Sequence, residues 1–346
     1  LGRGGFGEVY FAISDAGREV AVKAVQNYED IELRGISHCM NLKSPHLVMI
    51  FDVKKDAEGV AWVIMEYVSG ANLRELLDES GDGFGIEQAV YFMRELCKGV
   101  SYLHEADVVH RDLKPHNIFF EDGVVKIGDY SLSKAISTSH RSGHTSTVGS
   151  VHYMAPEISE GRYDKTVDIY ALGVILYEML TGRPPYEGES MAEVLMKHLT
   201  SQPDVSVLPQ PFRNVVGKAM RRDPGQRYQT ASEMLRDLST GDQLDYSRPP
   251  ASLSLIGQRA AEQRSKQVRT PAALEETYAT PAAFRDTDSK DASQPFQRPA
   301  AGDLDSLGLW WRPKADAVVG KDPVPAFVRG RIGIVACLLS VPIGCA

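Results

Sequence analysis

The sequence predicts an α+β fold in which strands come first along the chain and helices follow. Residues 1–11 are typical of a strand, a glycine turn and a second strand, with Val9, Phe11 and Ile13 at a period of two, and Trp62-Val63-Ile64-Met65 is typical of a buried strand. From residue 86 onward, apolar residues recur at intervals of three and four, which is typical of helices packed on a core. Strand-rich sequence followed by helix-rich sequence indicates an α+β architecture.

Composition limits the class of protein. The chain has 346 residues, of which 43% are hydrophobic, so it can bury one or two substantial cores. A formal charge of −8 argues against nucleic acid as the main partner. The four cysteines contain no CxxC pair, which fits a reducing cytoplasm and argues against a zinc site. The chain begins at Leu1 without a signal-peptide pattern, directly on a glycine-rich stretch, so we expect a truncated first strand.

A dense group of polar residues occupies 109–117, which read Val-His-Arg-Asp-Leu-Lys-Pro-His-Asn. Transfer of a phosphoryl group to a hydroxyl needs a base, a cation near the migrating oxygens and oxygen ligands for magnesium. Asp112 can be the base and Lys114 the cation. Asn117 and Asp129 can be the magnesium ligands. The ordered set favours this chemistry over a solvated loop.

Further motifs flank this group in a fixed order. They are Gly2-Arg3-Gly4-Gly5-Phe6-Gly7-Glu8-Val9, Val20-Ala21-Val22-Lys23, Ala155-Pro156-Glu157 and Asp168-Ile169-Tyr170-Ala171-Leu172-Gly173. One GxGxxG motif alone is weak, but the series resembles the eukaryotic-type, or Hanks-type, serine/threonine protein kinase family in its bacterial receptor-like form. The resemblance covers about the first 240 residues.

The resemblance implies a bilobal protein-kinase-like fold with ATP and Mg²⁺ between the lobes. We expect an N-lobe at about 1–66, built of a small antiparallel sheet and one main helix, and a mostly helical C-lobe at about 69–240. A helix over 86–105 delivers the chain to the catalytic loop. The closing helix spans 231–238.

The resemblance also implies the residues that bind the nucleotide. Glycines allow backbone amides to close over the phosphates. Lys23 contacts the α- and β-phosphates, and as a lysine in an apolar strand it needs a partner. Met65 is the expected gatekeeper behind the adenine pocket, a role that is compatible with an ordinary core position. The remaining expected pocket residues are Gly2, Gly4, Gly7, Val9, Ala21, Glu66, Val68 and Phe119.

The partner of Lys23 is expected to be a glutamate on the following helix. The usual spacing lands on Gly35, which cannot form an ion pair. About three extra residues would bring Glu32 to this place, on one helical face with Ile36 and Met40. Glu29 is the alternative.

The segment after Asp129 departs from the family pattern. Tyr130 and Ser131 replace the usual Phe and Gly, and serine reaches the backbone angles of glycine only at a cost. A pseudokinase scaffold that binds nucleotide or partners without transfer is therefore an alternative. Between Ser131 and Glu157 lie many hydroxyls, and we expect Thr145 or Thr147 to be autophosphorylated. The added charge would recruit Arg111.

The resemblance implies two further structural features. Asp168 is expected to be buried and to hold the backbone of the catalytic loop. Glu157 is expected to pair with Arg227. Glu157 and Arg227 are expected to serve the fold rather than the chemistry.

By the same resemblance, Lys114, two residues after Asp112, is typical of kinases that act on Ser or Thr. The expected partners are therefore Ser/Thr-containing proteins, including copies of this chain. Asn72 and His116 replace acids that read arginine in some family members, so strong selection for arginine is not expected. The intact Ala-Pro-Glu motif disfavours a kinase of small molecules.

The C-terminal third differs in composition. Residues 241–325 are rich in Ala, Pro, Ser, Thr and Gln, and we expect a disordered linker. Residues 326–346 end in an uncharged apolar stretch preceded by Arg329 and Arg331. A truncated membrane segment and an apolar docking or disordered tail are both open here. The kinase domain is expected in the cytoplasm, tethered to a membrane if the tail inserts.

Overall fold

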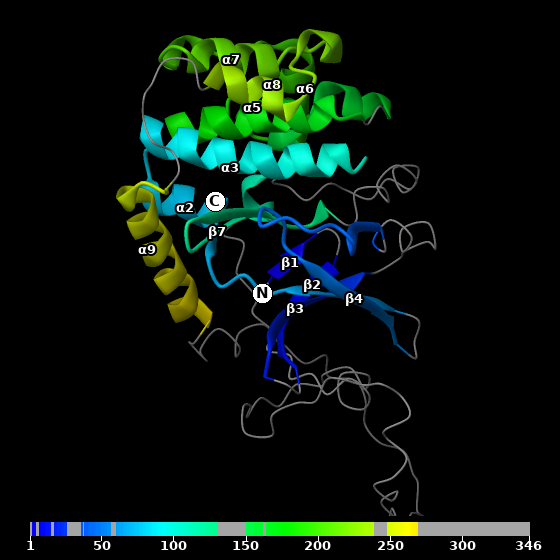
Figure 1. The fold of residues 1–346 in the computed structure, drawn as a ribbon. Coiled ribbons are helices and arrows are strands. Elements are labelled where there is room, and N and C mark those ends of the chain that lie inside the picture. Colours follow the sequence, from blue (N-terminus) through cyan, green and yellow to red (C-terminus); the bar gives the residue numbers. More distant parts are fainter. Residues whose placement is uncertain are drawn as a thin grey trace, which may run out of the picture.

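The structure is a computed structural model. It describes residues 2–4, 7–14, 17–25, 36, 38–56, 60–130, 150–161, 164–238 and 248–268. Figure 1 shows a sheet-rich part that contains the N-terminus and a larger helical part stacked on it. The predicted α+β fold with a sheet-built N-lobe and a helical C-lobe is confirmed.

A five-stranded antiparallel sheet in the order β1-β2-β3-β5-β4 forms the N-lobe. Its strands are β1 (Gly2–Gly4), β2 (Gly7–Ile13), β3 (Glu19–Val25), β4 (Ile50–Lys55) and β5 (Ala61–Glu66). Strand β3 is buried on both faces after Glu19, because a hydrophobic cluster packs on each face. One face packs in a small cluster with Trp62 and Ile64, and the other face contributes Val25 to the main core.

A second, three-stranded sheet lies at the junction with the helices. It contains β6 (Ala71–Asn72), β7 (Ile118–Glu121) and β8 (Val124–Ile127), in that order. The end of β8 is fastened to the chain that enters the N-lobe sheet, because Val48 N donates to Ile127 O at 2.9 Å and Ile127 N donates to His46 O at 2.9 Å. The two lobes thus meet where β8 ends.

The helices of the C-lobe surround α5 (Thr166–Thr181), which is buried from Thr166 through Met179. A helix that is apolar on all sides is stable only inside a protein. Gly173 allows close packing, since an added Cβ there would lie 2.8 Å from the Cβ of Ala219. The other helices are α2 (Leu73–Ser80), α3 (Ile86–Glu105), α6 (Met191–Thr200), α7 (Phe212–Ala219) and α8 (Ala231–Leu238). The 3₁₀ segments are η1 (Pro115–Asn117), η4 (Ser150–Tyr153), η5 (Pro156–Glu160), η6 (Val205–Val207) and η7 (Pro224–Gln226).

The predicted helices at 86–105 and 231–238 are confirmed by α3 and α8. The prediction of a disordered linker over 241–325 is wrong for residues 251–268, which form helix α9 (Ala251–Val268). Its apolar residues bury against the C-lobe, as Leu253 is 0% and Ile256 7% exposed. Weak apolar periodicity hid this helix, and its tertiary contacts stabilise it.

The apolar segment 326–346 lies outside the described residues, so its membrane contact stays a prediction. Among the helices that the structure does describe, none is both long and apolar enough to cross a bilayer.

Candidate active site

Lys23 and Asp129 form an ion pair between the lobes. Strand β3 holds Lys23, which is 4% exposed, and its Nζ lies 2.8 Å from Oδ1 of Asp129 just after β8. Burial by itself would raise the pKa of Asp129, but the ammonium of Lys23 and its hydrogen bond outweigh burial and lower that pKa. Asp129 is therefore a carboxylate at neutral pH. Its backbone lies in the left-handed region at φ 59°, a costly conformation that concentrates at functional sites.

The loop before β7 brings three predicted catalytic side chains together. Lys114 Nζ lies 2.8 Å from Asp112 Oδ2. Asn117 Nδ2 donates to the carbonyl oxygen of Asp112 at 2.8 Å and to its Oδ2 at 3.3 Å. Pro115 starts the short η1 turn, which brings both Lys114 and Asn117 to Oδ2 of Asp112. Because its Nδ2 is engaged, Asn117 has its Oδ1 left for a cation.

Asp168 fixes the backbone of this loop from the start of α5, as predicted. Its Oδ2 accepts from His110 N at 2.8 Å and contacts His104 Nε2 at 2.8 Å, while its Oδ1 accepts from Arg111 N at 2.8 Å. Burial alone would raise the pKa of Asp168, but the hydrogen bond with His104 and the other donors lower it. The His110 ring also contacts the Gly128 carbonyl at 2.9 Å, so one buried carboxylate orders the loop on which both Asp112 and Asp129 depend.

Tyr130 is anchored in a way that the sequence did not reveal. Its ring is 1% exposed, and its hydroxyl donates to the Val48 carbonyl at 2.8 Å. Burial raises the pKa of this hydroxyl, which therefore stays protonated as a donor. The phenylalanine that is usual in this place could not make this bond. The tyrosine thus ties the segment after Asp129 to the chain that leads into β4.

The sheet register aligns most of the expected nucleotide pocket. Val9 lies opposite Lys23, and Ala21 lies opposite Met65. Phe119 lies against Gly128, because one of its ring carbons would be 3.0 Å from a Cβ added there. Other expected members are Gly2, Gly4 and Gly7 in the β1–β2 hairpin, and Val68, which is buried.

The comparison with known families decides the relationship. The family model of the protein kinase domain matches residues 1–238. The chain belongs to the protein kinase family. It is 35% identical over 262 residues to the serine/threonine-protein kinase PrkC of Bacillus subtilis, covering 71% of this chain and 40% of PrkC. It is 36% identical over 263 residues to the probable serine/threonine-protein kinase PknB of Corynebacterium glutamicum, covering 69% of this chain and 40% of PknB.

A probable serine/threonine-protein kinase of Streptomyces coelicolor is 33% identical over 285 residues, which cover 75% of this chain and 41% of that protein. The chain thus spans about 40% of the length of these three relatives.

In this kinase domain, the side chain of Glu66 is engaged by residues of β8 and of the chain before β4. It pairs with Lys126, and its Oε2 accepts from Met49 N at 3.1 Å. Only the backbone of Glu66 is therefore expected to meet a nucleotide.

The glutamate expected to pair with Lys23 lies outside the described residues, whether it is Glu32 or Glu29. Part of its helix is described. Met40 N donates to Ile36 O at 3.0 Å, Ile36 is 0% exposed, and Met40 packs against the same core. The prediction that Ile36 and Met40 share one helical face is confirmed, and the pairing of Lys23 with Glu32 stays a prediction.

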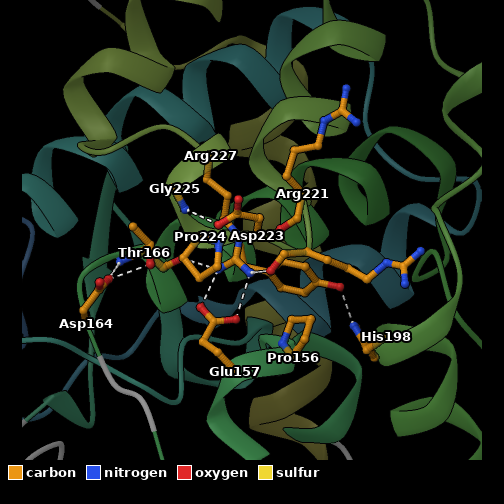
Figure 2. A network of polar contacts seen from close by, with 12 residues as sticks. Pro156, Glu157, Asp164, Thr166, His198, Arg221, Asp223, Pro224, Gly225 and Arg227 are labelled. Atoms are coloured by element: carbon orange, nitrogen blue, oxygen red, sulfur yellow. Dashed lines mark hydrogen bonds and ion pairs between the residues drawn. The ribbon is translucent and has the colours of Figure 1, made fainter. Parts of the chain in front are cut away.

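The predicted pair of Glu157 and Arg227 is confirmed (Figure 2). Arg227 Nη1 lies 2.6 Å from Glu157 Oε1, and Nη2 lies 2.8 Å from Oε2. The guanidinium also donates to the carbonyls of Arg221, Arg222 and Thr166. A buried bidentate pair with its remaining donors satisfied joins η5, α5 and the η7 turn into one unit.

A second buried ion pair was missed. Arg74 of α2 pairs with Glu178 of α5 (Nη1–Oε1 2.5 Å), and Tyr153 donates to Glu178 Oε2 at 2.6 Å. The signal in the sequence was Glu178 itself, a charge within the mostly apolar stretch that follows Asp168 in α5, which needs a partner if it is buried. Its partners are distant in sequence, so only the fold identified them.

The segment after Asp129 is described only in part. Ser150 begins η4, whereas Ser131, Thr145 and Thr147 lie outside the described residues.

Proposed function

We propose that this kinase domain transfers the γ-phosphate of ATP to serine or threonine hydroxyls of proteins. The observation that carries the proposal is that Lys114 lies close to both Asp112, the proposed base, and Asp129, a proposed metal ligand. Lys114 bonds the carboxylate of Asp112 at 2.8 Å and is close enough to help lower the pKa of Asp129, which itself bonds Lys23. These contacts support a site in which the proposed base, the two lysines and a proposed metal ligand act on one nucleotide. The serine/threonine kinases among its relatives support the choice of hydroxyl.

Each side chain has one role in this proposal. Asp112 accepts the proton of the attacking hydroxyl, and Lys114 steadies the charge on the γ-phosphate. Lys23 contacts the α- and β-phosphates. Asn117 and Asp129 would hold Mg²⁺, which when bound neutralises charge on the phosphate oxygens. Among the described residues, no group of three or more His, Cys, Asp or Glu is arranged to hold a metal ion by itself, which agrees with a site that is completed by phosphates and water.

Glu32 is proposed as the partner of Lys23 during turnover. It lies four residues before Ile36, whose carbonyl accepts a helical hydrogen bond and whose side chain faces the core. One further helical turn would place Glu32 on that same face. Lys23 could then hold Asp129 and Glu32 together.

The partners proposed are Ser/Thr-containing proteins and copies of this chain, with autophosphorylation at Thr145 or Thr147. Phosphopeptide mapping after incubation with ATP tests the latter. The apolar segment 326–346 is proposed as a membrane contact because its C-terminal stretch carries no charge. Partitioning of the chain into lipid vesicles with and without residues 326–346 tests this contact.

Incubation of the full chain with γ-labelled ATP, magnesium and a generic protein substrate tests the central proposal. Asp112→Asn should lower turnover by about 10²–10⁴-fold, as for a general base. Asp107→Asn is the matched control, because Asp107 lies five residues earlier on the surface, with 89% of its side chain exposed, and should keep wild-type turnover. Binding of ATP without any transfer by the wild-type chain would show a pseudokinase instead.

A further inference from the structure

Helix α9 lies outside residues 1–238, the part that matches the kinase family, and yet it is packed on the kinase domain. Figure 1 shows it beside α2 at one side of the molecule. Its buried face consists of residues at intervals of three and four, with an added Cβ at Gly257 only 3.1 Å from the ring of Phe120 on β7. The buried apolar residues of this face are Leu253, Ile256 and Ala260.

Polar contacts complement this apolar face. Glu79 on α2 lies 3.1 Å from Arg259 Nε and accepts a hydrogen bond from Gln263 at 2.5 Å. Arg264 lies deeper, with 16% of its side chain exposed, and its Nε is 3.9 Å from Oε1 of Glu75. The acidic face of α2 and the basic face of α9 therefore match in charge as well as in shape.

Arg264 also reaches the hinge, defined here as residues 66–70 between β5 and β6. Its Nη1 donates to the Gly70 carbonyl at 3.0 Å. Gly70 lies two residues after Val68, whose backbone is expected to bond adenine.

Other contacts hold the same end of the hinge on the C-lobe. Glu121 of β7 accepts from Ser69 N at 2.6 Å and from Gly70 N at 3.3 Å. Glu75, the acid beside Arg264, caps α2 by accepting from Asn72 N at 2.8 Å. The carbonyl of Gly70 is thus the point at which α9 joins an already ordered turn. Ordering the hinge before the nucleotide arrives lowers the entropy that binding must remove.

We propose that α9 holds the hinge in its nucleotide-binding conformation and that Arg264 is a positioning residue for ATP. The proposal rests on the proposed use of ATP, and it assigns a role in nucleotide affinity to a helix that follows residues 1–238, the part matched by the family model. Arg264 acts through the hinge backbone and does not touch the reacting atoms. The coupling therefore changes the affinity for ATP and leaves the chemical step unchanged.

The test measures the Kd of ATP by calorimetry and kcat by phosphate transfer for the full chain and three variants. Arg264→Ala should raise the Kd about fivefold or more, with kcat at saturating ATP within about twofold of wild type. Arg264→Lys, which keeps a donor and the charge, should recover part of the affinity. Arg259→Ala is the matched control: it also removes an ion pair between α9 and α2, from a side chain that is 61% exposed, and should leave the Kd unchanged.

A fourth variant detaches the whole helix. Leu253→Asp with Ile256→Asp places charge on the buried face and should raise the Kd at least as much as Arg264→Ala. An unchanged Kd in both Arg264→Ala and this double variant would overturn the proposal, as would an equal rise in Arg259→Ala. A wild-type chain that binds ATP but transfers no phosphate would refute the proposed transfer and leave the affinity test valid. A chain that binds no ATP would overturn both.

Discussion

Lys23 donates a hydrogen bond to Asp129 across the boundary between the lobes, at 2.8 Å, from a side chain that is 6% exposed. A buried ammonium is costly unless it is paired, and this pair joins the N-lobe sheet to the loop that is proposed to hold magnesium. The lowered pKa of Asp129 stabilises the fold above the ordinary value of 3.8, and this contribution is lost as pH falls through the lower value of the folded state. The pair is thus intact throughout the physiological range.

Removal of the cation should disable this site. Lys23→Met keeps an unbranched side chain but removes the charge, so we expect kcat/KM for ATP to fall by about 10²-fold or more. The pKa of Asp129 should rise, because burial then lacks its counterweight. Steady-state kinetics measures the first effect. Lys54→Met on β4, where the side chain is 49% exposed and pairs with Asp52, is the control and should retain wild-type kinetics. Equal activity of the two variants would contradict the assigned role of Lys23.

The ion pair of Glu157 and Arg227 should contribute strongly to stability. Arg227→Ala leaves a buried carboxylate without its partner and should lower the free energy of unfolding by about 3–5 kcal/mol in urea titrations. Lys165→Ala removes a pair that is 42% and 89% exposed and should cost about 0–1 kcal/mol. The variant that combines Glu157→Ala with Arg227→Ala should lose less than the sum of the two single changes. Strict additivity would show that the pair is not coupled.

Two glycines should respond to alanine in opposite directions. A Cβ at Gly70 would lie 2.1 Å from the Phe120 carbonyl oxygen, so Gly70→Ala must displace the hinge and should destabilise the fold by about 1–3 kcal/mol. A Cβ at Gly217 on α7 meets no atom within 4 Å. Gly217→Ala should stabilise the fold by about 0.5–1 kcal/mol, because alanine is the better helix former. Thermal unfolding measures both changes, and a loss of stability in Gly217→Ala would contradict this account.

His198 should make stability depend on pH. Burial, and to a lesser extent the nearby His152, lower the pKa of His198 to about 4, and its Nδ1 lies 2.7 Å from the Tyr170 hydroxyl. Between that value and the ordinary 6.5, the unfolded chain binds the proton more readily than the folded one, so stability decreases as pH falls through this window. The full effect of this group is about 3 kcal/mol.

The comparison of urea unfolding at pH 7 and pH 5 checks this dependence. His198→Gln removes the titrating group, so the loss of stability on going to pH 5 should be smaller than in the wild-type chain. His38→Gln changes an exposed histidine and serves as the control. If His198→Gln lost as much stability between pH 7 and pH 5 as the wild-type chain, His198 would be excluded as the source of the pH dependence.

Local sequence was sufficient to predict the catalytic loop and the main elements. Asp112, Lys114 and Asn117 lie within six residues of one another, so their convergence needs only one short turn. The long helix α3 was also predictable, because its apolar periodicity is a property of the local sequence. Glu157 and Arg227 were paired through the resemblance of the motifs that contain them, although 70 residues separate them.

Other features depend on which distant segments meet, and only the tertiary structure decided them. A buried Glu178 needs a partner, but the sequence around it does not predict that this partner is Arg74, which is 104 positions away. Helix α9 looked like linker because its own periodicity is weak, and it is stable through the surface of α2 and β7 on which it packs. Sequence alone thus determined the chemistry available to this protein, since residue type and local spacing carry it. The fold decided which charges are buried together and what holds the hinge, because burial and long-range pairing arise only when the whole chain is packed.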